Sequence, residues 1–170
     1  KLPVSLLGVT LLTPIFAVSV GQVMNGLSRP VFGWVSDWIG RERTMVVAFL
    51  LGAFAFFTLI LFGNIPVWFV LTTGLALFAW GQIFALFPAI CTDIYGSRFA
   101  IANYGMLYTA KGVASWFVPW TSELSAAKGW TVVFAVLLAF NAIAAALVFL
   151  LKRARSKLLT REALPGLSGA

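Results

Sequence analysis

Long runs of apolar residues alternate along the chain with short polar segments, and this pattern predicts membrane-spanning helices. A helix needs about 20 mainly apolar residues to cross a bilayer. The runs are continuous, whereas the strands of a membrane barrel alternate apolar and polar residues. Five stretches qualify: one that begins between Val4 and Pro14 and ends near Ser36, then 44–62, 64–88 or slightly beyond, 102–120 and 130–151. We expect Asn64 to cap the third helix, with Pro66 in its first turn.

The composition supports an all-α, polytopic membrane bundle. The chain of 170 residues is 61% hydrophobic and only 10% charged, whereas soluble domains hold about a quarter charged residues. The net charge of +7 comes mainly from loops and the tail, so we expect the lipid bilayer as partner and no nucleic acid.

The positive charges also predict the topology, because basic loops stay cytoplasmic. The first loop carries Arg41 and Arg43, and the tail carries five cations, Lys152, Arg153, Arg155, Lys157 and Arg161. The C-terminus is then cytoplasmic and the N-terminus of the chain outside, in a cell membrane. The chain starts at Lys1 within apolar sequence, so we expect a fragment of a longer protein: residues 1–151 as a transmembrane half-bundle and 152–170 as a basic cytoplasmic tail.

Two cations, Arg29 and Lys111, lie near the middle of predicted spans. Arg29 is eight residues before Asp37, or roughly 12 Å deep at 1.5 Å per residue, and Lys111 has about nine residues on either side. A charge in the bilayer costs about 2.5–3.5 kcal/mol and usually faces a cavity or a partner. The favoured interpretation is a site for an anion with two negative charges. The alternative is that a missing part of the protein supplies carboxylates.

Polar and aromatic residues surround these cations in the sequence pattern. Gln22, Asn25 and Arg29 form one helical stripe, and Tyr104, Tyr108, Lys111 and Ser115 form another. Trp80, Gln82 and Phe84 lie mid-span on the third helix, where rings can orient cations by cation–π contact. Pro30 lacks the N–H that would bond to the carbonyl of Gly26, which predicts a hinge in the first helix. Glycine pairs seven residues apart, at 26/33, 74/81 and 105/112, predict close helix contacts.

The residue inventory argues against an enzyme. The chain has no histidine and one cysteine, Cys91, which we expect to be buried. Its carboxylates lie at helix ends or in loops. We therefore expect no catalytic residue, no metal site and no cofactor.

The segment from Gly33 to Arg43 resembles the loop signature of the major facilitator superfamily, which lies between the second and third helices of each half. Gly33 would allow close helix contact, Gly40 would allow a tight turn, and Asp37 would pair with Arg41 or cap a helix. The match is imperfect, because Trp38 and Glu42 stand where basic residues are usual.

The segments 25–41, 80–88 and 103–115 resemble the oxalate/formate antiporter family, helices 8 to 12 of its C-terminal half. The resemblance implies that Arg29 and Lys111 are its anion-binding cations and that Trp80, Phe84 and Tyr108 belong to its aromatic cage. The oxalate-specific member has tyrosine at the position of Phe84 and tryptophan at that of Tyr108, which leaves the precise substrate open.

These features predict a secondary transporter that exchanges small carboxylate anions, with oxalate and formate as best candidates, by alternating access around a midplane dicationic site. Asn25, Gln22 and Gln82 are further candidate substrate-binding residues. The missing N-terminal half of the carrier is an expected partner. Proton-coupled monocarboxylate symport and an inactive truncated fragment are the alternatives.

Overall fold

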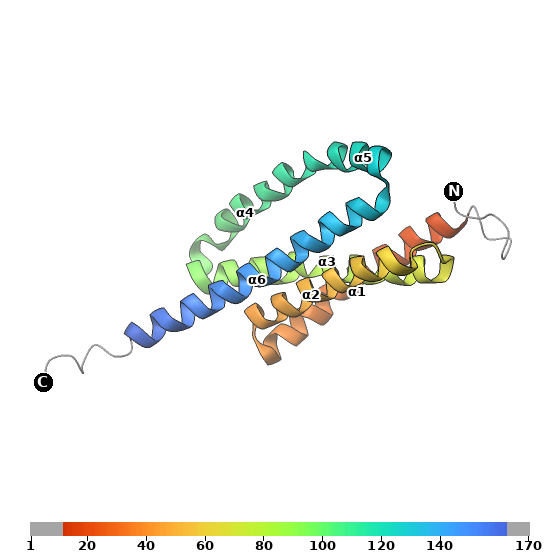
Figure 1. Ribbon diagram of the computed structural model, residues 1–170. Coiled ribbons are helices and arrows are strands. Elements are labelled where there is room, and N and C mark those ends of the chain that lie inside the picture. The colour runs from red at the N-terminus through yellow and green to blue at the C-terminus, as the bar shows by residue number, and fades with distance from the viewer. Residues whose placement is uncertain (1–11, 163–170) are drawn as a thin grey trace, which may run out of the picture.

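The regular structure of the described residues is entirely helical and contains no strand, which confirms the predicted all-α fold class. The computed structural model describes residues 12–162, so the start of the first predicted span lies partly outside it (Figure 1). The elements are α1 (Leu12–Ile39), α2 (Arg41–Phe62), α3 (Pro66–Tyr95), the short 3-10 helix η1 (Ser97–Phe99), α4 (Ala100–Ser115), α5 (Phe117–Lys128) and α6 (Trp130–Glu162).

Four of these helices form a bundle. α1 packs mainly against α3, and α2 packs against α3 and α6. α4 and α5 form an arch that leaves the bundle after α3 and returns to it at the start of α6 (Figure 1). The core of the bundle contains the buried residues Phe32, Met45, Ala48 and Leu86. Cys91 is buried as predicted.

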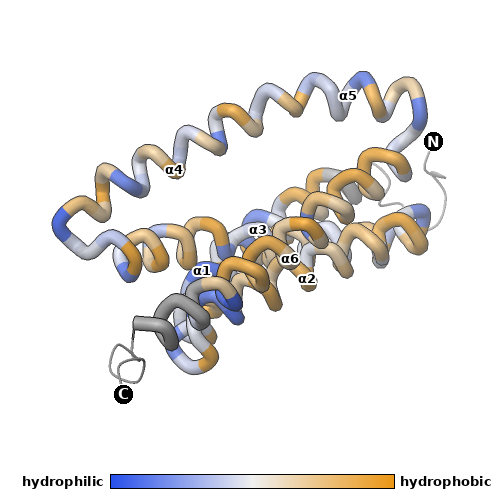
Figure 2. The backbone as a smooth tube through the Cα atoms, turned by 60° about the vertical axis from the view of Figure 1, so that its left-hand side comes forward, coloured by the Kyte–Doolittle hydropathy of each residue, from blue (hydrophilic) through white to orange (hydrophobic). Residues whose placement is uncertain are grey.

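Three helical segments within the described residues are long and apolar enough to cross a membrane: Arg41–Phe62, Pro66–Tyr95 and Trp130–Ala154. Figure 2 shows α2 and much of α6 as predominantly hydrophobic, whereas α4 and α5 alternate apolar with polar positions. The other two predicted spans do not meet this criterion. α1 is 28 residues long but carries Gln22, Asn25 and Arg29, and α4 and α5 have 16 and 12 residues.

The fourth predicted helix is divided, which corrects the expectation of one element over 102–120. The backbone leaves the α-helical hydrogen-bond pattern at Trp116, whose N–H donates to the carbonyl of Val113 at 3.1 Å. In a continuous α-helix the residue at position 119 would donate its N–H to the carbonyl of Ser115, four residues earlier, but Pro119 has no N–H. The missing donor explains why α4 stops at Ser115 and α5 starts anew at Phe117.

The ends of α3 and α6 also differ from the prediction. Ile65, with φ −96° and ψ 118°, occupies the N-cap position of α3, and no side chain forms a capping hydrogen bond there. The prediction that Asn64 caps this helix was therefore wrong. α3 runs through Pro88 to Tyr95. The hydroxyl of Thr92 donates to the carbonyl of Pro88 at 3.0 Å, which adds a local bond beyond the proline. α6 continues to Glu162, 11 residues past the expected end at Leu151.

The loop signature forms a tight turn at Gly40 but uses a different ion pair from the expected one. Gly40 has φ +90°, a conformation that favours glycine, as predicted. Nε of Arg41 donates to Oδ2 of Asp93 on α3 at 2.5 Å, so the partner of Arg41 is Asp93 rather than Asp37. The predicted close contact at Gly33 is also wrong among the described residues, because nothing lies within 4 Å of a Cβ placed there.

The Arg41–Asp93 pair should stabilise the bundle only slightly, because its side chains are 33% and 45% exposed. Exposed ion pairs contribute about 0.2–1 kcal/mol. We expect Arg41→Gln and Asp93→Asn each to lower the unfolding free energy by less than about 1 kcal/mol. A double-mutant cycle in detergent checks this, and full additivity of the two changes would contradict a direct interaction.

Candidate functional site

Arg29 of α1 and Lys111 of α4 meet at one aromatic ring of α3. The guanidinium carbon of Arg29 lies 4.6 Å from the ring centroid of Phe84. Nζ of Lys111 lies 4.7 Å from the same centroid. Residues 82 positions apart in the sequence therefore place two positive charges side by side. The sequence analysis placed Arg29 and Lys111 near the middle of their predicted spans, and their shared contact with Phe84 agrees with a similar depth.

Three rings surround the ammonium group of Lys111. Besides Phe84, Nζ lies 5.6 Å from the centroid of Trp80 and 5.2 Å from that of Tyr108. All of these distances fall within the roughly 6 Å range of cation–π attraction. Trp80 packs edge-on against Phe84 at 5.4 Å, and Phe84 lies 6.3 Å from Tyr108. The three predicted cage residues thus form one cluster in the structure.

The polar stripe on α4 extends this cluster. The ring of Tyr104 packs against Tyr108 with the centroids 5.3 Å apart. The hydroxyl of Ser115 forms a hydrogen bond within its own helix, since it donates to the carbonyl of Gly112 at 2.6 Å. The stripe therefore supplies Lys111 and two tyrosines to the site, while Ser115 closes its own helix end.

A close crossing of α1 and α3 brings Arg29 next to Phe84. A Cβ placed on Gly81 would lie 2.7 Å from the carbonyl oxygen of Asn25 and 2.8 Å from its Oδ1, and it would overlap Oγ of Ser28. Ser28 is fully buried, and its hydroxyl donates to the carbonyl of Asn25 at 2.6 Å. Only glycine fits this crossing. Of the predicted glycine pairs, 74/81 faces α1, whereas 26/33 and 105/112 have open space in front of them in the described part of the chain.

The polar candidates differ in their surroundings. Asn25 is 6% exposed and Gln82 is 1% exposed. The side-chain oxygens of both, Asn25 Oδ1 and Gln82 Oε1, are buried without a hydrogen-bond partner. Gln22 is exposed on α1. Of the three, Asn25 lies on the helix turn next to Arg29, and its free oxygen faces the crossing with α3.

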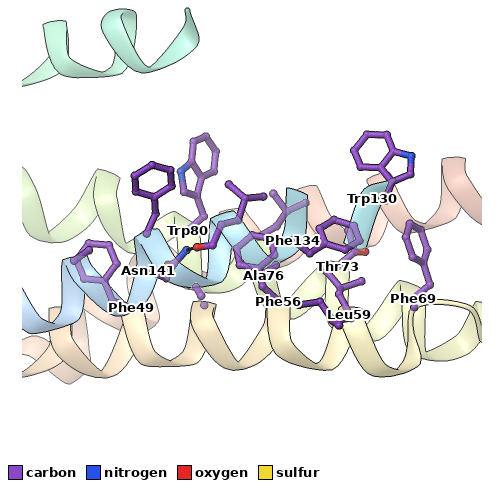
Figure 3. A pocket seen from close by; sticks show the side chains of 18 of the residues that line it. Phe49, Phe56, Leu59, Phe69, Thr73, Ala76, Trp80, Trp130, Phe134 and Asn141 are labelled. Atoms are coloured by element: carbon purple, nitrogen blue, oxygen red, sulfur yellow. Dashed lines mark hydrogen bonds between the residues drawn. The ribbon is translucent and has the colours of Figure 1, made fainter. Parts of the chain in front are cut away.

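Trp80 and Gln82 also line a second space, a pocket of about 1230 Å³ between α2, α3 and α6. Figure 3 shows Phe56 and Leu59 of α2 and Phe134 and Asn141 of α6 pointing into it. Its lining includes neither Arg29 nor Lys111. The pocket is therefore a different place from the two-cation cluster, and Trp80 lies between them.

Among the carboxylates whose side chains the structure describes, none forms an ion pair with Arg29 or Lys111. Arg29 and Lys111 are both exposed among the described residues, and two cations beside one ring repel each other. The arrangement thus favours an anion between them. Sequence reasoning missed Ser28, Gly81 as a positioning residue, and Asp93. Ser28 lies three residues after Asn25, so helical spacing could have placed it on the same face of α1.

Comparison with known proteins gives consistent matches. The family model described as Major Facilitator Superfamily matches residues 2–166. The chain is 37% identical over 134 residues to the "Oxalate:formate antiporter" of Oxalobacter formigenes, covering 76% of this chain and 32% of that protein. It is 26% identical over 99 residues to the "Uncharacterized MFS-type transporter YhjX" of Escherichia coli (strain K12), covering 58% of this chain and 25% of that protein. The chain thus spans about a third or less of the length of these relatives.

Proposed function

The chain belongs to the Major Facilitator Superfamily, and on this basis we propose that it is the C-terminal part of a carrier that exchanges small carboxylate anions. Oxalate and formate are the best candidates, because the relative with 37% identity is described as an oxalate:formate antiporter. The observation that carries the proposal is the convergence of Arg29 and Lys111 on Phe84. A transporter function in place of an enzymatic one is part of this proposal.

Arg29 and Lys111 replace the water that hydrates the carboxylates. The planar guanidinium of Arg29 suits bidentate contact with one carboxylate. The ammonium of Lys111, which the rings of Trp80, Phe84 and Tyr108 hold in place, acts as a point charge for the other. Asn25 contributes a polar group beside Arg29. Gln22 and Gln82 are more remote members of the proposed site.

The mechanism is alternating access, in which the two halves of a carrier move around a midplane site. An N-terminal half supplies the other wall of the cavity and is the proposed partner of this chain. The empty site holds two like charges, so its closed form is costly until an anion neutralises them. That penalty makes transport an obligatory exchange. Pro30, next to Arg29 within α1, is the proposed hinge, and the basic tail lies in the cytoplasm.

Vesicle transport tests this mechanism. The chain is produced together with an N-terminal half and reconstituted into vesicles loaded with oxalate or formate. Uptake of labelled oxalate should require a carboxylate inside and should not respond to a pH gradient. Uptake into empty vesicles that follows an imposed proton gradient would instead establish proton symport and contradict obligatory exchange.

Phe84 should set substrate affinity, because its ring contacts both cations. Each cation–π contact contributes about 0.5–2 kcal/mol. Phe84→Leu is therefore expected to raise the half-saturating oxalate concentration by about tenfold. Phe84→Tyr retains the ring and serves as the matched control, with affinity within about threefold of the original. Equal affinities of the leucine and tyrosine variants in the exchange assay would show that the ring does not orient the cations.

A further inference from the structure

A smaller hollow lined by charged residues lies at the end of the bundle where α2 begins and α3 ends. Its volume is about 440 Å³, and α2, α3 and α6 all contribute to its lining. Arg41 and Arg43 come from the first turn of α2, Asp93 from the last turn of α3, and Lys152 from α6. None of these residues belongs to the proposed carboxylate site.

The hollow has a surplus of positive charge. Its lining holds three cations, Arg41, Arg43 and Lys152, against two carboxylates, Glu42 and Asp93. Asp93 is engaged by Arg41. The first turn of α2 adds the positive end of the helix dipole, and Gly40 before it offers no side chain to cap the N–H groups there. The hollow is therefore suited to an anion.

The hollow lies where the apolar part of the helices ends. The span of α2 starts at Arg41, and the span of α6 ends at Ala154, two residues after Lys152. At 1.5 Å per residue, α6 with its 33 residues is about 50 Å long, which exceeds a hydrocarbon core of about 30 Å. The rest of α6 continues past the membrane with further cations in its sequence. Lipid headgroups flank the hydrocarbon core, so a hollow at the end of these apolar spans is expected at the level of the lipid phosphates.

We propose that this hollow binds the phosphate of an anionic phospholipid headgroup. Arg43 and Lys152 contact the phosphate from two helices. Ile39 and Ile90, which also line the hollow, provide apolar contact for the glycerol end of the acyl chains. A soluble anion would use the cations but would gain nothing from this apolar part. Lipid binding here links α2, α3 and α6 at one end of the bundle.

Lipid retention tests the proposal. The chain is purified in a detergent mixed with equal amounts of phosphatidylglycerol and phosphatidylcholine, and the bound lipids are quantified by mass spectrometry. The protein should retain the anionic lipid preferentially. Each cation near the membrane surface contributes about fivefold in affinity, so Arg43→Gln combined with Lys152→Gln should reduce the preference by more than about tenfold. Arg43→Lys combined with Lys152→Arg should keep it.

Arg98→Gln combined with Lys128→Gln is the matched control, because it removes the same charge from exposed positions outside the hollow. It should leave the preference unchanged. An equal loss in the control, or no loss in the Arg43 and Lys152 variant with its helix content intact, would overturn the proposal. Complete displacement of the lipid by inorganic phosphate at constant ionic strength would assign the hollow to a soluble anion instead. Carboxylate exchange is a separate readout, so either proposal can fail alone.

Discussion

Arg29→Gln and Lys111→Gln are each expected to reduce carboxylate exchange by about 100-fold or more. Glutamine keeps much of the length and polarity of either side chain but removes the charge. A charge-assisted hydrogen bond contributes about 1.5–3 kcal/mol, and a bidentate contact combines two such bonds. Loss of about 3 kcal/mol corresponds to about 100-fold in affinity. The measurement is initial uptake of labelled oxalate into vesicles loaded with formate.

Two exposed cations provide the controls for this experiment. The guanidinium carbon of Arg98 on η1 lies 5.3 Å from the ring centroid of its neighbour Phe99, and no other cation–π contact of Arg98 is found among the described residues. Lys128 is the last residue of α5. Arg98→Gln and Lys128→Gln should exchange oxalate at rates within about twofold of the original. Near-normal exchange by both Arg29→Gln and Lys111→Gln, with normal amounts of protein in the vesicles, would rule out a two-cation site.

Gly81→Ala is expected to damage both the stability of the bundle and the exchange activity. The new methyl group would approach the backbone carbonyl of Asn25 to 2.7 Å, and a backbone atom cannot move aside as a flexible side chain does. Overpacking of this kind typically costs about 1–3 kcal/mol. α1 must shift away from α3, and Arg29 then moves away from Phe84. Exchange should fall by about tenfold or more.

Gly74→Ala is the matched substitution on the same helix face. Its methyl group would lie 3.5 Å from Val20 and 3.7 Å from Met24, which is ordinary van der Waals contact. We expect its unfolding free energy to stay within about 0.5 kcal/mol of the original, with normal exchange. Unfolding in increasing denaturing detergent compares the two variants. Equal stability and equal activity of both would show that the crossing at Gly81 does not position Arg29.

Continuous apolar runs were sufficient to predict where the helices lie, but they could not predict the division of the fourth helix or how the helices end and pack. The run over 130–151 identified α6, yet its cationic continuation is also helical because Lys and Arg have good helix propensity. Pro119 was visible in the sequence, but the break at Trp116 depends on the particular carbonyl that loses its donor. The pairing of Arg41 with Asp93 joins residues 52 positions apart, which no local pattern contains.

The candidate site was predictable to the extent that charge in an apolar span is rare. Arg29 and Lys111 stood out because few residues of their kind occur within the apolar runs, and the helical spacing of 104, 108 and 111 placed the tyrosines beside the lysine. Ser28 did not stand out, since small residues are common in membrane helices. Gly81 was predicted only as one of three glycine pairs, and the pattern did not show that it positions Arg29. The surroundings of Gln82 could not be predicted either, because its burial and its place in the lining of the larger pocket depend on how α2 and α6 pack against α3.

The most direct test measures the dissociation constants of oxalate and formate for the reconstituted carrier at equilibrium. Oxalate carries two negative charges at neutral pH and formate carries one. If Arg29 and Lys111 each hold a carboxylate, Lys111→Gln should weaken oxalate binding by about 100-fold and formate binding by less than about tenfold. The ratio of the two dissociation constants should then change by about tenfold or more. An unchanged ratio would contradict a site in which two cations share one dianion.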